Sequence, residues 1–253
     1  MDCYLIQCHR QVINIIFGEI LTMIIPEQIT TVAFDADDTL WVNETRFRDL
    51  EMEFVRMMTD YVDEKTCRNA LLQTELKNME FYGYGVKPFV LSVIETGIQL
   101  SGEQIPQQNI AKLIVLGKQI LNASIELLPG AQETLSYLQT TDYRLVLATK
   151  GDALDQERKL RASGLEHYFD HIEVMSDKQL PNYELLLRKL AITPEEFLMI
   201  GNSVKSDVLP VIALNGQAVH IPFHTTWEYE QISHENQEFY EFESLSELLN
   251  AIS

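Results

Sequence analysis

The sequence predicts an α/β protein in which a doubly wound parallel sheet is interrupted, after its first strand, by an all-α insert. Three observations support this fold class. The apolar run from Thr31 to Asp35 is typical of a buried parallel strand. Residues 43–123 show helical periodicity and no convincing strand pattern. After Pro129 and Gly130, strands alternate with helices, which is the pattern of a parallel sheet.

The chain is expected to divide into three parts. Residues 1–25 form a helical N-terminal extension, residues 26–42 and 124–253 form the α/β core domain, and residues 43–123 form the inserted helical domain. The apolar run from Val12 to Ile25 is interrupted by Glu19, so it is too short and too broken for a membrane span. We do not expect a signal peptide, because no clean apolar core or small-residue cleavage site follows the start.

The elements follow from the spacing of apolar residues. In the insert, four helical blocks begin near Phe47, Ala70, Phe89 and Ile110, and Asp63 and Ser101 are the expected breaks between blocks. In the core, strands are expected at residues 143–149, 171–175, 197–201 and 217–221. Helices are expected at residues 131–139, 182–190 and 244–252. One more follows the strand at residues 143–149 and ends near residue 163, and another begins near residue 206.

Composition restricts the class of protein. The chain has 253 residues, 46% of them hydrophobic, which is enough for one large domain or a domain with an insertion. The formal net charge of −19 leaves no basic footprint for nucleic acid. Cys3, Cys8 and Cys67 show no C-x-x-C spacing, which fits a reducing cytosol. We expect a cytoplasmic protein that binds neither nucleic acid nor membrane and has no evident obligate protein partner.

A cluster of carboxylates follows the first strand. Asp35, Asp37 and Asp38 lie at its carboxyl end, where open α/β sheets place their ligand sites. Carboxylates this close repel one another, so they persist together mainly where a cation or a shared proton relieves the repulsion. An acidic loop without chemistry is the alternative interpretation of this stretch taken alone.

Three later strand ends carry further signals. Thr149 is followed by Lys150 and Gly151, which fits a phosphate cradle of hydroxyl and main-chain N–H groups, although a helix cap explains the same residues. Lys178 follows the next strand and, alone, is explained by an exposed surface position. Asn202 and Asp207 follow the fourth strand, where their oxygens suit a hard cation such as Mg²⁺ or cap a helix.

Taken together and in this order, these residues resemble the four motifs of the haloacid dehalogenase-like hydrolase superfamily. The motifs appear as FDADDT (Phe34 to Thr39), Thr149, Lys178 and GNSVKSD (Gly201 to Asp207). The resemblance covers residues 30–42 and 128–253 and implies a Rossmann-like core. The helical insert stands where phosphatases of this superfamily carry a cap between the first and second motifs.

The resemblance implies a role for each motif. Asp35 is similar to the nucleophile that forms an aspartyl-phosphate, and Asp37 to the general acid and base, whose main-chain carbonyl also binds the metal. Thr149, Lys178 and the N–H groups of Lys150 and Gly151 resemble the clamp on the phosphoryl oxygens. The implied ligands of Mg²⁺ are Asp35, Asp37, Asn202 and Asp207.

Asn202 and Asp37 differ from the pattern of some members of the superfamily, and both differences bear on the chemistry. Many members have Gly-Asp where this chain has Gly201 and Asn202, so the metal receives a neutral oxygen there unless Asp207 supplies the charge. Dehalogenases of the superfamily lack the second carboxylate, so Asp37 favours phosphoryl transfer. The expected function is therefore an Mg²⁺-dependent phosphatase acting on a small phosphorylated metabolite. A phosphomutase of the same fold and a catalytically weak protein that only binds a phosphorylated ligand are the alternatives.

The insert is expected to set substrate choice. Phe81 to Gly85 form an aromatic, glycine-rich break between two helices. We expect Tyr82, Tyr84 and Lys87 to line the substrate pocket, with a helix C-cap and two packed tyrosines as the alternative interpretation.

Overall fold

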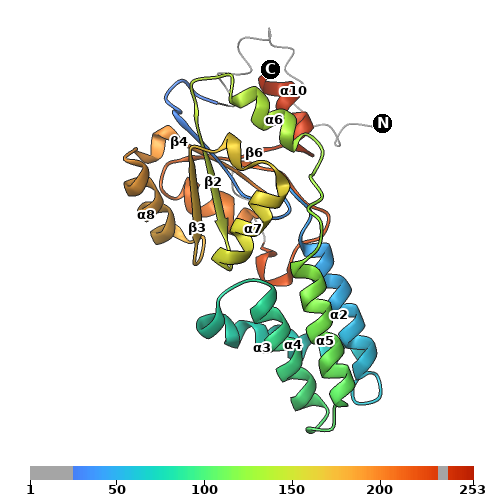
Figure 1. The fold of residues 1–253 in the computed structure, drawn as a ribbon. Coiled ribbons are helices and arrows are strands. Elements are labelled where there is room, and N and C mark those ends of the chain that lie inside the picture. Colours follow the sequence, from blue (N-terminus) through green and yellow to red (C-terminus); the bar gives the residue numbers. More distant parts are fainter. Residues whose placement is uncertain (1–24, 233–238) are drawn as a thin grey trace, which may run out of the picture.

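The computed structural model describes residues 25–232 and 239–253 (Figure 1). Its centre is a six-stranded sheet in the order β3-β2-β1-β4-β5-β6, and each neighbouring pair is parallel. The strands are β1 (Thr31–Phe34), β2 (Arg144–Lys150), β3 (His171–Met175), β4 (Phe197–Gly201), β5 (Gln217–His220) and β6 (Tyr240–Glu241). Because β1 lies in the middle, its carboxyl end is flanked by those of β2 and β4.

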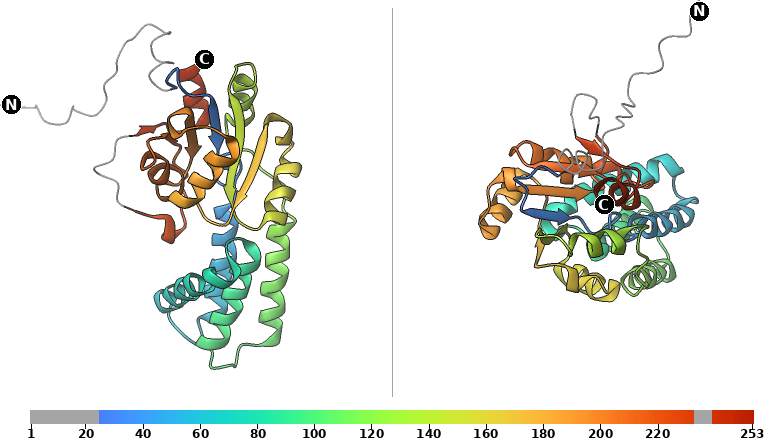
Figure 2. Two further views of the ribbon diagram at one scale, coloured as in Figure 1. Left: turned by 90° about the vertical axis from the view of Figure 1, so that its left-hand side faces the viewer. Right: turned by 90° about the horizontal axis from the view of Figure 1, so that it is seen from above.

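Helices cover both faces of this sheet (Figures 1 and 2). Successive side chains of a strand point to opposite faces, so Val32 and Phe34 enter one core layer and Ala33 the other. The first layer holds α6 (Ala131–Leu138), α7 (Ala153–Ser163) and α10 (Leu245–Ile252), and the second holds α8 (Leu180–Leu190) and α9 (Leu209–Ile212). This arrangement confirms the predicted doubly wound fold class.

Four helices form the insert beyond the carboxyl ends of the strands (Figure 1). They are α2 (Glu44–Met58), α3 (Glu64–Tyr82), α4 (Val86–Leu100) and α5 (Gln107–Leu121). Their apolar stripes meet in a separate core around Phe54, Leu71 and Val93. The division into core and cap domains at residues 42–43 and 123–124 stays a prediction. Among the described residues, no helix has both the length and the apolarity that a membrane crossing requires.

The two chain crossings between core and insert run side by side. Val42 N donates to Glu126 O at 2.9 Å, and Leu128 N donates to Leu40 O at 2.9 Å. Further from this junction, the Tyr84 hydroxyl donates to Asp177 Oδ1 at 3.1 Å. The insert is therefore joined to the core by a hydrogen-bonded pair of segments and also touches it over the strand ends.

The structure differs from the expected elements in two places. The short edge strand β6 was not predicted, because two exposed residues give no periodicity. The helix expected from Ser206 begins instead as a π-helical turn, Val204–Val208, and continues as α9. The predicted helix in residues 1–25 lies almost wholly outside the described residues.

Candidate active site

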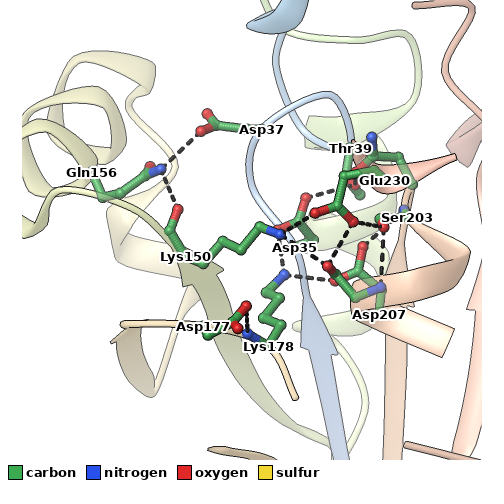
Figure 3. A network of polar contacts seen from close by, with 12 residues as sticks. Asp35, Asp37, Thr39, Lys150, Gln156, Asp177, Lys178, Ser203, Asp207 and Glu230 are labelled. Atoms are coloured by element: carbon green, nitrogen blue, oxygen red, sulfur yellow. Dashed lines mark hydrogen bonds and ion pairs between the residues drawn. The ribbon is translucent and has the colours of Figure 1, made fainter. Parts of the chain in front are cut away.

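A cavity of about 190 Å³ lies between the carboxyl ends of the strands and the helical insert. Its floor carries the residues that the sequence places at strand ends, and Figure 3 shows Asp35, Lys178 and Asp207 in a network of polar contacts. The predicted motif residues that line it are Asp35, Asp37, Thr149, Lys150, Gly151, Lys178, Asn202 and Asp207. Residues far apart in the sequence meet here because parallel strands end at the same edge of the sheet.

Asp35 is buried at the centre of this floor. Lys178 Nζ donates to Asp35 Oδ1, and the Thr39 hydroxyl donates to Oδ2 at 3.1 Å (Figure 3). Burial raises the pKa of the Asp35 carboxyl to about 7, although the Lys178 ammonium opposes this shift. A further positive charge beside Asp35 would therefore favour the carboxylate form that a nucleophile needs.

Asp207 balances the charge of Lys178 from the other side. Lys178 is 2% exposed, and its Nζ lies 2.7 Å from Asp207 Oδ1. Burial disfavours the ammonium, but Asp207 and Asp35 outweigh it and raise the pKa of Lys178. Asp207 also accepts from Ser203 N at 3.0 Å. A Cβ on Gly201 would lie 2.3 Å from Asp207 Oδ2, so only glycine leaves room for this carboxylate.

Asn202 faces the point where a cation would bind. One terminal atom of its amide lies 3.2 Å from both Asp35 Oδ2 and the carbonyl oxygen of Asp37. With nitrogen at that position, the amide donates to both oxygens. With oxygen there, it accepts from the Thr39 hydroxyl at 3.3 Å, and three oxygens from Asp35, Asp37 and Asn202 converge.

This geometry fits a hard cation. Mg²⁺ binds oxygens at about 2.0–2.1 Å, so neighbouring ligands of its octahedron lie about 3 Å apart. The separations of 3.2 Å are close to that value. Within the described residues, no three His, Cys, Asp or Glu side chains form a metal cluster. The fit depends instead on one carboxylate, one amide and one main-chain carbonyl, and Asp207 faces Lys178 rather than this point.

Asp37 is held by donors that the motifs did not include. Lys159 Nζ lies 2.6 Å from both of its carboxylate oxygens. The Trp41 indole donates to Oδ1 at 2.7 Å. The Gln156 amide donates to Oδ2 at 2.8 Å (Figure 3). The half-buried carboxylate therefore receives four contacts from two elements, the loop after β1 and helix α7.

Asp38 connects the loop after β1 to the insert. Its side chain accepts from Asn43 N at 2.7 Å and from Glu44 N at 3.0 Å, which caps the start of α2. Its φ of 62° lies in the left-handed region, which Asp tolerates better than most residues. Burial raises its pKa to about 7.

The residues predicted to bind phosphate, Thr149, Lys150 and Gly151, already make some contacts within the protein. Thr149 is buried at the end of β2 and lines the cavity, and Gly151 N donates weakly to Met175 O at 3.4 Å. The Lys150 ammonium binds Ser206 Oγ at 2.9 Å and the carboxylate of Glu230. Lys150 outweighs the burial of Glu230 and lowers the pKa of that carboxyl.

The upper part of the cavity is formed by the insert. Tyr84 lines it, with its ring 4.7 Å from Lys150 Nζ and edge-on to Trp227. Glu44 and Glu75 line the same wall, and burial raises the pKa of each to about 8. Burial therefore favours the protonated form of both carboxyl groups, and Arg48, whose Nε lies 3.3 Å from Glu44 Oε1, opposes this shift at Glu44.

Two of the predicted specificity residues lie outside the cavity lining. Tyr82 is 53% exposed at the end of α3, and Lys87 pairs with Asp152 at 2.8 Å across the gap between insert and core. Among the cavity residues that sequence reasoning missed, Gln156, Lys159 and Glu230 contact the predicted motif residues directly. Gln156 and Lys159 share the i, i+3 spacing of one helix face, but that spacing is common on any surface helix. Glu230 lies in a short turn without periodicity.

Comparison with known proteins shows the family of this chain. The fold is a parallel α/β domain with a carboxylate at the end of its central strand. The haloacid dehalogenase-like hydrolase family matches residues 29–214, and the chain belongs to this family. A haloacid dehalogenase-like family hydrolase from Xanthomonas campestris is 34% identical, with a TM-score of 0.79 over 89% of this chain and 91% of that one.

The curated relatives are either less identical in sequence than the Xanthomonas campestris protein or match a shorter part of this chain. A glyceraldehyde 3-phosphate phosphatase from Methanopyrus kandleri is 25% identical over 71% of this chain and 78% of that protein. Another from Methanothermobacter thermautotrophicus is 34% identical, but the match spans only 32% of this chain and 38% of that protein. The family resemblance drawn from the motifs is thus confirmed.

The raised pKa values of Glu44 and Glu75 predict how stability depends on pH. Each folded-state carboxyl keeps its proton to about pH 8, whereas in the unfolded chain it loses the proton near 4.5. Between these values the folded state binds more protons, so stability falls as pH rises, by up to about 1.4 kcal/mol per pH unit and group. Thermal melts should show the melting temperature falling from about pH 5 to pH 8.

The variant Glu75→Gln should flatten this slope, since a neutral amide has no proton to lose. Glu80→Gln, on the exposed side of the same helix, is the matched control and should keep the wild-type slope. A melting temperature that rises across this range, or a slope that Glu75→Gln leaves unchanged, contradicts the prediction.

Proposed function

We propose that the protein is an Mg²⁺-dependent phosphatase that hydrolyses a small phosphorylated metabolite through an aspartyl-phosphate. The observation that carries the proposal is the pairing of two carboxylates with separate surroundings at one strand end. Asp35 is buried between Lys178 and Thr39, and Asp37 stands two residues further on with its own donors. A nucleophile and a separate acid–base group are what phosphoester hydrolysis requires.

In the first step an oxygen of Asp35 attacks phosphorus. The new bond forms as the ester P–O bond breaks, and the leaving oxygen takes a proton from Asp37. Thr149, Lys178 and the main-chain N–H groups of Lys150 and Gly151 would hold the phosphoryl oxygens, which carry the charge of the transition state. In the second step Asp37 accepts a proton from water, the water oxygen attacks phosphorus, and the bond to Asp35 breaks to release phosphate.

The metal would bind where three oxygens converge. Asp35 Oδ2, the carbonyl oxygen of Asp37 and the Asn202 amide oxygen would hold Mg²⁺, with Asp207 acting through Lys178. When bound, the ion supplies positive charge that screens the repulsion between Asp35 and an incoming phosphate. This role matters here because burial, together with the charges of Asp207 and Asp37, raises the pKa of Asp35 toward neutral.

The names of the curated relatives support a phosphatase over the alternatives. Three of them are glyceraldehyde 3-phosphate phosphatases, so a short phosphorylated metabolite is a reasonable first substrate. The cavity of about 190 Å³ also suits a small molecule. A phosphomutase would transfer the phosphoryl group to a sugar hydroxyl, and a binding protein would hold it without turnover. A panel of phosphorylated metabolites with Mg²⁺ separates these functions by phosphate release, isomer formation or binding alone.

The nucleophile can be tested directly. Asp35→Asn should reduce phosphate release to below a few per cent of wild type, because an amide does not form the acyl phosphate. The matched control is Asp142→Asn, which removes an exposed carboxylate from the loop before β2. Substantial turnover by Asp35→Asn, measured with the best substrate of the panel, would exclude the assignment.

The metal site can be tested by binding as well as by activity. Chelation should abolish turnover and added Mg²⁺ should restore it. Asn202→Asp should keep or tighten Mg²⁺ binding measured by calorimetry, because it places a charged oxygen beside the ion. A large loss of Mg²⁺ affinity in this variant would show that Asn202 does not face the metal.

The role of the insert can be tested at Tyr84. The floor of the site recognises only a phosphoryl group, so discrimination must come from the cavity wall. Tyr84→Ala should change the ranking of substrates more than it changes Mg²⁺ affinity or melting temperature. Phe81→Ala, which truncates a 76% exposed side chain nearby, is the control. A variant that loses stability and keeps the wild-type ranking would show that Tyr84 only packs.

A further inference from the structure

Helix α7 carries a lysine that the four motifs do not include and that contacts the expected acid–base group. Lys159 is 7% exposed, and its Nζ lies 2.6 Å from Oδ1 and 2.6 Å from Oδ2 of Asp37. Its one further hydrogen bond among the described residues goes to Asn43 Oδ1, at 3.2 Å, and its charge also acts on the Asp155 carboxyl. The ammonium is therefore committed to Asp37 and to the first residue before α2.

We propose that Lys159 is a positioning residue that fixes the carboxylate of Asp37 for proton transfer. This inference rests on the proposed phosphatase function. An ammonium centred between both oxygens restricts rotation of the carboxylate, which a single contact would not do. Proton transfer needs the acid within hydrogen-bond reach of the leaving oxygen, and a displacement of about 1 Å can cost about 100-fold in rate.

Gln156 is a second side chain of α7 that contacts Asp37. Gln156 is 4% exposed and lies one turn before Lys159, where its amide nitrogen donates to Asp37 Oδ2 and to Lys150 O. Its amide oxygen is buried without a hydrogen-bond partner among the described residues. A buried acceptor without a partner costs free energy. The orientation of the Gln156 amide is therefore set by the contacts of its nitrogen with Asp37 and Lys150 and not by its oxygen.

The turn before α7 makes this approach possible. Gly151 has a φ of 141°, and a Cβ there would lie 2.9 Å from Gln156 Nε2. The absence of a side chain at Gly151 therefore lets Gln156 reach across to Asp37. With Lys178 beside Asp35 and Lys159 beside Asp37, each of the two carboxylates has its own lysine from a different helix or loop.

Leaving-group dependence separates positioning from mere stability. An alkoxide needs a proton as it departs, whereas p-nitrophenolate departs without one. In Lys159→Met, kcat/KM for the best alkyl phosphate of the panel should fall about 10- to 100-fold. The value for p-nitrophenyl phosphate should fall far less, since kcat/KM reports only the steps up to transfer to Asp35. Lys159→Arg, which can also contact both oxygens, should recover part of the loss.

Two controls define the result. Arg158→Met removes a neighbouring charge from the same helix and should keep the wild-type ratio of the two substrates. In an Asp37→Asn background, Lys159→Met should cause no further loss with the alkyl phosphate, because the group it positions is absent. If Lys159→Met does not fold, Gln156→Met should show the same selective loss at smaller size.

Equal losses with both substrates, or an unchanged ratio in Lys159→Met and Gln156→Met, would overturn the positioning role. If wild type turns over monoesters and Asp35→Asn does not, such a result rejects this inference alone. Failure of the wild-type protein to release phosphate from any monoester would reject the proposed function, and the inference with it.

Discussion

The buried contact of Lys178 with Asp35 and Asp207 is the interaction on which the site depends. One ammonium, almost fully removed from water, lies between two carboxylates that come from different strand ends. Such a group is stable only while its partners stay in place, since removing one partner of a buried ion pair costs about 3–5 kcal/mol. Two local features place Asp207 beside Lys178. Gly201 leaves room for the Asp207 carboxylate, and the π-helical turn that follows carries Asp207.

Asp35 and Asp37 are distinguished by their surroundings rather than by distance along the chain. Asp35 is buried on the sheet side, and its pKa is raised toward neutral. Asp37 is turned toward α7 and receives hydrogen bonds from Trp41 and Gln156 besides its ion pair. Different environments of this kind are how neighbouring acids take different roles in catalysis. The Asn202 amide adds a third environment, because one of its terminal atoms lies 3.2 Å from Asp35 Oδ2 and from the carbonyl oxygen of Asp37.

The sequence was informative where periodicity and strand ends carry the signal. A buried central strand followed by carboxylates predicted the place of Asp35, and parallel topology explains why Thr149, Lys178 and Asn202 line the same cavity. It was uninformative for Lys159 and Glu230, since a basic residue on a helix and an acidic residue in a turn occur on every protein surface. Their importance arises from burial, which only the packing of α7 and of the turn at Glu228–Glu230 determines.

The junction between core and insert has a mechanical consequence. The two crossing segments are hydrogen-bonded to each other on both sides of Trp41, so they form a narrow ribbon rather than two independent threads. The paired segments attach the insert at one end, and Tyr84 and Lys87 contact the core at another place, so the insert is held at two separated points. Asp38 caps α2 from within the loop that also holds Asp35 and Asp37, so the position of the first insert helix is tied to the floor of the site.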